Sequence, residues 1–141
     1  MSGDGYAGDI KPKEAWEILQ REPDACLIDV RTDAEWRYVG LPLLDQLGKP
    51  THCVGWQLFP DNHVNENFVD EVSGLGIQPE QTVLLICRSG QRSRHAAIAL
   101  TAAGFQCCYN VSEGFEGDKD ATGHRGTVGG WKVAGLPWGQ G

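Results

Sequence analysis

The chain has 141 residues and a mass of 15.4 kDa, a length that fits one domain and leaves no room for two cores of ordinary size. Hydrophobic residues make up 40% of it and charged residues 22%, which excludes disorder along the whole chain. The net charge of −7 and the pI near 4.9 argue against nucleic acid or an anionic membrane as partner. We expect one domain over residues 1–141.

The N-terminal segment, residues 1–9, holds no basic cluster followed by an apolar run, and nothing later approaches the roughly 18 apolar residues of a membrane span. The cysteines form an odd set without a C-x-x-C pair, which disfavours a disulfide framework and a zinc ribbon. We therefore expect reduced thiols, a cytoplasmic protein, and no metal or other cofactor. The cysteines are Cys26, Cys53, Cys87, Cys107 and Cys108.

The first half of the chain alternates helical and strand patterns, which indicates an α/β domain. Pro12 suits a first helical turn, and the apolar spacing after it predicts a helix over 12–21. The apolar run 25–30 predicts a strand buried on both faces, with Asp29 as its polar exception. The patterns that follow predict a capped short helix from Thr32 and Glu35 through Tyr38, a loop over 40–50, a strand over 52–56 and a helix between 65 and 74.

The strongest strand pattern lies in the second half, at 82–86, where every residue is β-branched or aliphatic. It leads into Cys87, and an alanine-rich helix is predicted over 93–103, with Gly104 as its C-terminal cap. The remaining patterns predict a strand over 105–111, a Gly-rich segment over 114–130, and a terminal segment whose tryptophans pack back onto the core.

Cys87 holds the position where ligands of open α/β sheets bind, at the carboxyl end of a strand and before a helix with free N–H groups. No Asp or Glu occurs between residues 81 and 112, whereas Arg88, Arg92 and Arg94 add three positive charges. Helix dipole, amide donors and guanidinium groups all favour a thiolate there. The pattern predicts a nucleophilic thiolate in an anion-binding loop. The alternative is a buried core cysteine beside arginines that only solvate a helix start.

Several neighbouring residues have a structural interpretation as well as a functional one. Gly90 is expected where the loop turns its amides inward, because a positive φ is cheap only for glycine. We expect Asp29 and Arg31 to fix the loop rather than to react, since a carboxylate in a buried strand needs a partner. His95 is assigned no role. The adjacent Cys107 and Cys108 should point to opposite faces of a strand, where packing is favoured over resolving-cysteine chemistry.

A family resemblance enters at the loop around Cys87. Residues 87–93, Cys-Arg-Ser-Gly-Gln-Arg-Ser, resemble the active-site loop of the rhodanese family of sulfurtransferases. Residues 27–31 with Glu35 and Trp36 resemble the family's early D-V-R…E-[WY] signature. Two later stretches, 110–115 and 129–137, are similar to its N-x-x-G-G and W-x-x-A-G-L-P ending. The resemblance covers roughly residues 10–138.

The sequence departs from the family pattern in two places. The G-H-I-P-G-A stretch is missing around 40–50, and residues 117–129 form a Gly-rich insert between the two closing motifs. Both departures concern the rim of the substrate site and leave its central loop intact. The insert is either a lid near the cysteine or a solvated loop, and it is left unassigned.

The resemblance implies a rhodanese-like fold, a central mostly parallel sheet flanked by helices, and a ping-pong transfer of sulfane sulfur without a cofactor. On this hypothesis Cys87 attacks thiosulfate or a related donor, forms a persulfide, and passes the sulfur to cyanide, a thiol or a protein acceptor. Arg88 and Arg92 would neutralise the developing charge. The substrate-binding residues expected from the loop are Arg88, Ser89, Gly90, Gln91, Arg92 and Ser93.

Two rival functions use the same residues. Cysteine phosphatases and arsenate reductases resemble this loop but place five residues between Cys and Arg, whereas four separate Cys87 from Arg92. A shorter loop makes a smaller cradle, suited to a sulfur atom rather than to a phosphate group. The second rival is a persulfide carrier or signalling module that releases its sulfur only to a partner protein. Turnover with small donors and acceptors would separate carrier from enzyme.

Overall fold

The computed structural model describes residues 5–58, 63–125 and 129–139. Parts of two predicted segments, residues 1–4 of the N-terminal segment and 126–128 of the insert, lie outside this description. Within it, no helix is long and apolar enough to cross a membrane.

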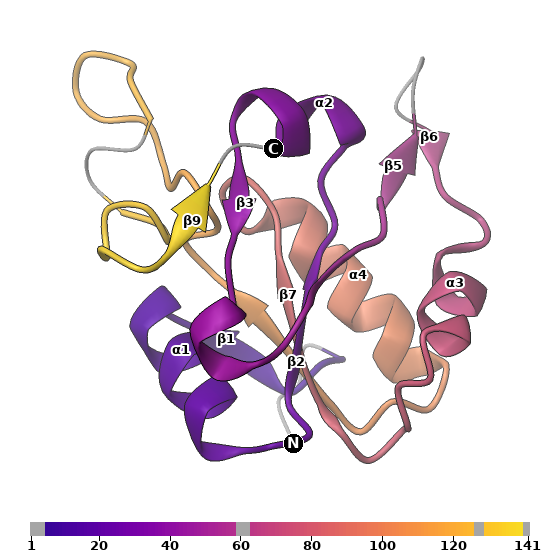
Figure 1. The fold of residues 1–141 in the computed structure, drawn as a ribbon. Coiled ribbons are helices and arrows are strands. Elements are labelled where there is room, and N and C mark those ends of the chain that lie inside the picture. The colour runs from indigo at the N-terminus through magenta and orange to yellow at the C-terminus, as the bar shows by residue number, and fades with distance from the viewer. Residues whose placement is uncertain (1–4, 59–62, 126–128, 140–141) are drawn as a thin grey trace.

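A five-stranded sheet forms the centre of the molecule, and all its neighbouring strands are parallel. Helices cover both of its faces (Figure 1), so the predicted central sheet flanked by helices is confirmed. Parallel strands buried on both faces need the near-continuous apolar sequences found here. The order across the sheet is β1 (Gly8–Ile10), β8 (Cys107–Val111), β7 (Thr82–Ile86), β2 (Cys26–Asp29) and β4 (Thr51–Cys53).

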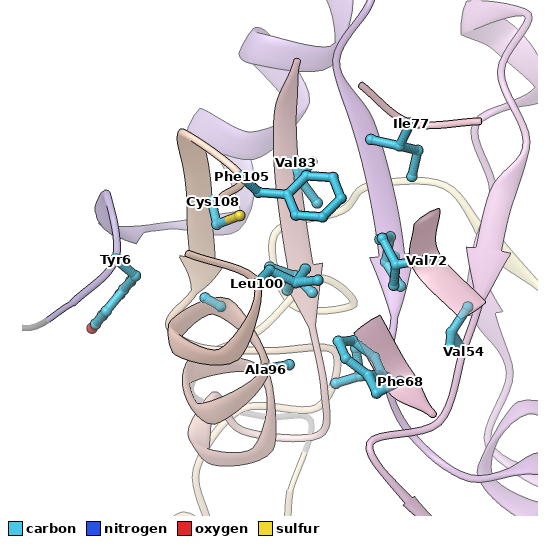
Figure 2. Close-up of a cluster of buried hydrophobic side chains, with 14 of the residues drawn as sticks. Tyr6, Val54, Phe68, Val72, Ile77, Val83, Ala96, Leu100, Phe105 and Cys108 are labelled. Carbon is cyan, nitrogen blue, oxygen red and sulfur yellow. The ribbon is translucent and has the colours of Figure 1, made fainter. Parts of the chain in front are cut away.

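Two hydrophobic clusters fill the space between the sheet and its helices. Side chains alternate along each strand, so Val83 and Leu85 of β7 face one cluster and Leu84 and Ile86 face the other. The first cluster lies under α3 (Phe68–Gly74) and α4 (Gln91–Ala102), and Figure 2 shows Ala96 and Leu100 of α4 pointing into it. The second lies under α1 (Pro12–Arg21).

Three sequence signals predict their elements correctly. The helix α1 and the strand β7 have the predicted bounds. The helix α2 (Asp33–Tyr38) begins at the predicted capping box, in which the Glu35 amide donates to Thr32 Oγ1 over 3.4 Å. Each of the three has a strong local signal. These are a Pro in the first turn of α1, a β-branched and aliphatic run in β7, and a reciprocal cap at the start of α2.

The prediction of a loop over 40–50 is wrong in part. That stretch contains β3 (Leu41–Pro42) and a 3-10 helix, η1 (Asp45–Leu47). β3 pairs antiparallel with β9 (Trp138–Gly139), a partner almost a hundred residues away that no local pattern reveals.

The strand predicted over 52–56 also needs correction, because β4 spans Thr51–Cys53 instead. A second small antiparallel sheet follows it. This sheet pairs β5 (Gln57–Leu58) with β6 (His63–Val64).

Three other elements begin at residues that differ from the prediction, because turns and helix caps occupy the preceding residues. α3 begins at Phe68 rather than near Asn65, whose side chain instead accepts the Asn67 amide over 3.0 Å in a turn. α4 begins at Gln91 because Gly90, with a φ of 103°, is its N-cap. β8 begins at Cys107 rather than at residue 105, since the chain first closes the end of α4.

At the two ends of the chain the structure departs from the prediction: the N-terminal segment contributes an unpredicted strand, and only one of the two terminal tryptophans is buried. The N-terminal segment supplies β1, whose Ile10 pairs with Val111 at the edge of the sheet. At the other end Trp131 is buried, as expected for a tryptophan that packs onto the core, while Trp138 in β9 stays 39% exposed.

Candidate active site

Cys87 follows the last residue of β7 and lies at the bottom of a hollow, with its side chain only 1% exposed. Its sulfur faces three donors at the start of α4. The amides of Gly90 and Ser93 lie 3.2 and 3.4 Å from Sγ, and the Ser93 hydroxyl lies 3.2 Å from it. Groups arranged in this way stabilise a negative charge on the sulfur.

The carbonyl groups of the loop are held from outside. The Phe115 amide donates to the Cys87 carbonyl over 2.8 Å, and the Glu116 amide donates to the Arg88 carbonyl over 3.0 Å. Asn110 Nδ2 donates to the Gly90 carbonyl over 3.0 Å. Because these carbonyls are bound on the outer side, the loop is fixed with amides directed at the sulfur.

Gly90 is required by space as well as by conformation. Its φ of 103° lies in the left-handed region, and a Cβ added there would lie 2.2 Å from the Ser112 carbonyl oxygen. Every other residue carries that Cβ, so only glycine allows the loop to lie this close to Ser112, which follows β8. The sequence predicted the need for a positive φ at Gly90 but not the lack of space for a Cβ.

Asn110 and Ser93 form a buried pair behind the sulfur. Asn110 Nδ2 donates to the Asp9 carboxylate and to the Gly90 carbonyl, so the amide oxygen must face Ser93, 2.5 Å from its hydroxyl. The single hydroxyl hydrogen of Ser93 therefore serves either Asn110 or Cys87.

The hollow above the cysteine has a volume of about 300 Å³. It brings together Cys87 and four of the six predicted substrate-binding residues, Arg88, Ser89, Gln91 and Arg92. The other two, Gly90 and Ser93, lie behind the sulfur and bind it through their amides. Arg94 does not line the hollow.

Sequence reasoning missed two lining residues and one support. His95, to which no role was assigned, lines the hollow one helical turn after Gln91, and that i, i+4 spacing could have indicated it. Asn110 belongs to the stretch 110–115 that resembles a family motif, but no contact with the cysteine loop was predicted for it. Gln57 reaches the hollow from β5, and no sequence signal marks it.

Arg92 is already paired. Its guanidinium contacts both carboxylate oxygens of Glu35, at 2.7 and 2.9 Å. The hydrogen bond to Glu35 raises the pKa of Arg92. Burial acts to raise the pKa of Glu35, but the hydrogen bond and the charge of Arg92, together with hydrogen bonds from Thr32, outweigh burial and leave that pKa below its ordinary value. Arg88 is exposed and has no ion pair among the described residues, so Arg88 is the uncompensated cation of the loop.

Asp29 and Arg31 form a fully buried ion pair, with 2.6 Å between Oδ2 and Nη2. Neither lines the cysteine's hollow. The Arg31 guanidinium lies 4.4 Å from the centre of the Phe115 ring, and the Phe115 amide holds the Cys87 carbonyl. Through Phe115 the pair supports the loop without touching the sulfur.

The other cysteines have different surroundings. Cys108 is buried and Cys107 is only half-buried, in keeping with opposite faces of β8. Burial raises the pKa of Cys26 to about 11 and that of Cys108 to about 12, so both are neutral thiols near pH 7. Within the described ranges no group of three or more metal-ligating side chains is placed to hold a metal ion.

The insert is anchored beside the loop. The Gly117 amide donates to the Arg88 carbonyl over 3.1 Å, and Arg125 Nη1 donates to the Gly117 carbonyl over 2.8 Å. The lid and the solvated loop both remain predictions for this segment.

The chain is similar to several known proteins in sequence and in fold. The family model described as STR4 middle domain matches residues 8–141. The crystal structure of Rv0390 from M. tuberculosis is 49% identical and covers 96% of this chain and 99% of its own, with a TM-score of 0.88. A rhodanese-like domain from Anabaena, 16% identical with a TM-score of 0.64 over 94% of this chain and 78% of its own, shares the fold.

Two curated relatives are similar over most of their length. An uncharacterized protein of Rickettsia conorii, RC0915, is 38% identical over 89% of this chain and 91% of its own. The thiosulfate sulfurtransferase GlpE of Glaesserella parasuis is 30% identical over 77% of this chain and 83% of its own. The fold and the cysteine loop define the class, and the chain belongs to the rhodanese-like sulfurtransferase family.

Proposed function

We propose that the protein is a thiosulfate sulfurtransferase that works through a persulfide on Cys87. The observation that carries the proposal is the environment of the Cys87 sulfur, which faces two amides and a hydroxyl at 3.2–3.4 Å at the bottom of a small, open hollow. A thiolate there is nucleophilic, and the same donors can hold the added sulfur.

The first half-reaction moves one sulfur atom to the protein. The Cys87 thiolate attacks the outer sulfur of thiosulfate, a new S–S bond forms, and the old S–S bond breaks with its electron pair leaving on sulfite. Arg88, exposed at the rim and without an ion pair in the described chain, attracts the dianion. The negative charge stays on the terminal persulfide sulfur, where the loop amides stabilise it.

The second half-reaction returns the thiolate. Cyanide attacks the terminal sulfur and leaves as thiocyanate, or a thiolate takes the sulfur and leaves as a persulfide. In both cases the electron pair of the Cys87 S–S bond goes back to Cys87. The size of the hollow, about 300 Å³, accommodates small sulfur compounds of this kind.

Intact-mass measurement tests the proposal. After incubation with thiosulfate and removal of the excess, the protein should gain one sulfur atom, and cyanide should remove it with release of thiocyanate. Cys87→Ser should gain none, and Cys108→Ser should gain one as the wild type does. A protein that never gains sulfur, or gains it equally in Cys87→Ser, would refute the proposal.

Repeated turnover distinguishes enzyme from carrier. An enzyme releases many thiocyanate molecules per chain from thiosulfate and cyanide, whereas a carrier loads once and discharges slowly to small acceptors. A protein acceptor and the cytoplasmic location remain predictions from the sequence.

A further inference from the structure

A second hollow adjoins the cysteine site. It lies between α2 and the segment that leads into β5, has a volume of about 660 Å³, and is called the α2 groove here. Gln57 lines both this groove and the hollow above Cys87, so the two hollows adjoin at this residue. A molecule whose reactive atom reaches the sulfur can therefore place its remainder in the α2 groove.

The two hollows differ in chemistry. The cysteine's hollow carries Arg88, Gln91 and the paired Arg92, groups suited to an anion. The α2 groove instead has the large hydrophobic side chains of Tyr38 and Leu58 at its surface, 76% and 38% exposed. Thiosulfate is small and doubly charged, so the apolar groove is not a place for the sulfur donor.

Contacts fix the α2 groove relative to the sulfur. Glu35, in the middle of α2, holds Arg92 of α4 through two hydrogen bonds of 2.7 and 2.9 Å. On the opposite wall, the Trp56 amide donates to the Val30 carbonyl over 3.0 Å, which ties the approach to β5 to the strand β2. Both walls of the groove are thus attached to elements that position Cys87.

The charges at the rim cancel one another. Asp33 and Arg37, which both line the α2 groove, form an ion pair of 3.2 Å along the helix. Arg31, the third charged residue that lines the groove, is paired with Asp29 over 2.6 Å. Since all three charges are paired within the protein, an uncharged apolar body suits the groove best.

On these grounds we propose that the α2 groove binds the organic body of the sulfur acceptor, and that the acceptor is a thiol with an uncharged, apolar or aromatic body. This inference rests on the proposed function. The acceptor thiolate attacks the terminal sulfur of the Cys87 persulfide, a new S–S bond forms on the acceptor, and the electron pair of the broken bond returns to Cys87. The apolar body stays in the groove while its sulfur enters the hollow.

Single-turnover discharge tests the proposal. Protein loaded with thiosulfate and freed of excess donor is mixed with benzyl mercaptan, 2-mercaptoethanol or cyanide, and loss of the added sulfur is followed by intact mass. Benzyl mercaptan should discharge the wild type about tenfold faster than 2-mercaptoethanol at equal thiolate concentration, because its ring enters the groove.

Two matched variants locate the effect. Leu58→Asp, which puts a charge into the groove, should slow discharge by benzyl mercaptan about tenfold and leave cyanide discharge unchanged. Leu75→Asp changes a leucine of similar exposure, 41%, that lines neither hollow, and should behave as the wild type. Normal sulfur loading in both variants shows that they are folded.

Each other outcome is decisive. Loading that fails in the wild type refutes the proposed function, and the inference with it. Normal loading with equal discharge by both thiols overturns the inference alone, as does a Leu58→Asp variant that slows cyanide as much as benzyl mercaptan. Benzyl mercaptan left on Cys87 as a mixed disulfide would show attack on the inner sulfur and would also overturn it.

Discussion

Cys87 and Cys108 are both buried cysteines, yet their surroundings differ. Cys87 follows the end of β7, where two amides and a hydroxyl of the next helix face its sulfur. Cys108 lies within β8 opposite Val83, and burial raises its pKa to about 12, only partly offset by a hydrogen bond with Thr101. Burial alone thus keeps a thiol neutral; the end of a strand beside a helix start supplies what a thiolate needs.

The largest expected effect is in alkylation. At pH 7.5 iodoacetamide should modify Cys87 about a thousandfold faster than Cys108, because a thiol with a pKa of about 12 is almost never ionised at that pH. Peptide mass mapping over time gives both rates in one sample. Cys108→Ala should leave the alkylation rate of Cys87 unchanged. Comparable alkylation rates for the two cysteines would contradict the expected difference in their reactivity.

The next effect tests the space behind the sulfur. Gly90→Ala should lower the sulfur loading rate about a hundredfold and the free energy of unfolding by about 3 kcal/mol, since its Cβ meets the Ser112 carbonyl oxygen at 2.2 Å. Gly104→Ala is the matched control, with a φ of 110° and nothing within 4 Å of the new Cβ.

Gly104→Ala should cost about 1 kcal/mol of unfolding free energy through its backbone alone and leave loading unchanged. Denaturant unfolding and intact-mass loading on both variants give the comparison. If Gly90→Ala and Gly104→Ala lost equal amounts of unfolding free energy and loading rate, the close approach to Ser112 would not account for the need for glycine at position 90.

A smaller effect is expected from the support of the loop. Asn110→Ala removes the hydrogen bonds to Gly90 and Ser93 and should slow loading about tenfold, because the loop amides are then less well fixed. Asp9→Asn keeps an acceptor oxygen for Asn110 and should change the rate less than about twofold. Stopped-time mass measurements give both rates. A tenfold loss in Asp9→Asn would show that the charge of Asp9, rather than its acceptor, is needed.

The smallest effect is in alkaline stability. Above the ordinary thiol pKa of 9.0 the unfolded chain loses the Cys108 proton while the folded chain keeps it up to about pH 12, so rising pH in this window favours unfolding. From pH 8 to pH 10 the wild type should lose about 1 kcal/mol more than Cys108→Ala. Urea unfolding at the two pH values measures this difference, and parallel losses would contradict the raised pKa.

Local sequence chemistry predicts the elements that carry strong signals of their own. Every residue of Thr82–Ile86 is β-branched or aliphatic, and Pro12–Arg21 has a proline start and helical spacing, so the predicted bounds of both elements are correct. The strands β1 and β3 could not be predicted, because they are two or three residues long and exist through pairing with β8 and β9. Such pairing is decided by the fold and not by the segment.

The candidate site likewise has a part that the local sequence predicts and a part that it does not. Cys87 and its loop are contiguous in sequence, so the thiol, the amides and the left-handed glycine could be recognised together. Glu35, Gln57 and Asn110 reach the loop from three other elements, and only the folded sheet brings them to it. Arg92 shows the consequence: the loop sequence includes it, whereas its partner Glu35, which lies in α2, was not predicted.

The ends of the insert meet one another beside the loop that holds Cys87, where the Gly117 amide donates to the Arg88 carbonyl. A Cβ on Gly117 would lie 2.3 Å from the Gly129 carbonyl oxygen, and one on Gly130 would lie 2.7 Å from the Gly117 amide nitrogen. Since closing a loop costs only slightly more entropy as it lengthens, a graft of another length between these glycines leaves both flanking motifs in place. This junction is therefore a position where a peptide tag or a reporter can be attached next to the Cys87 loop without rebuilding the sheet.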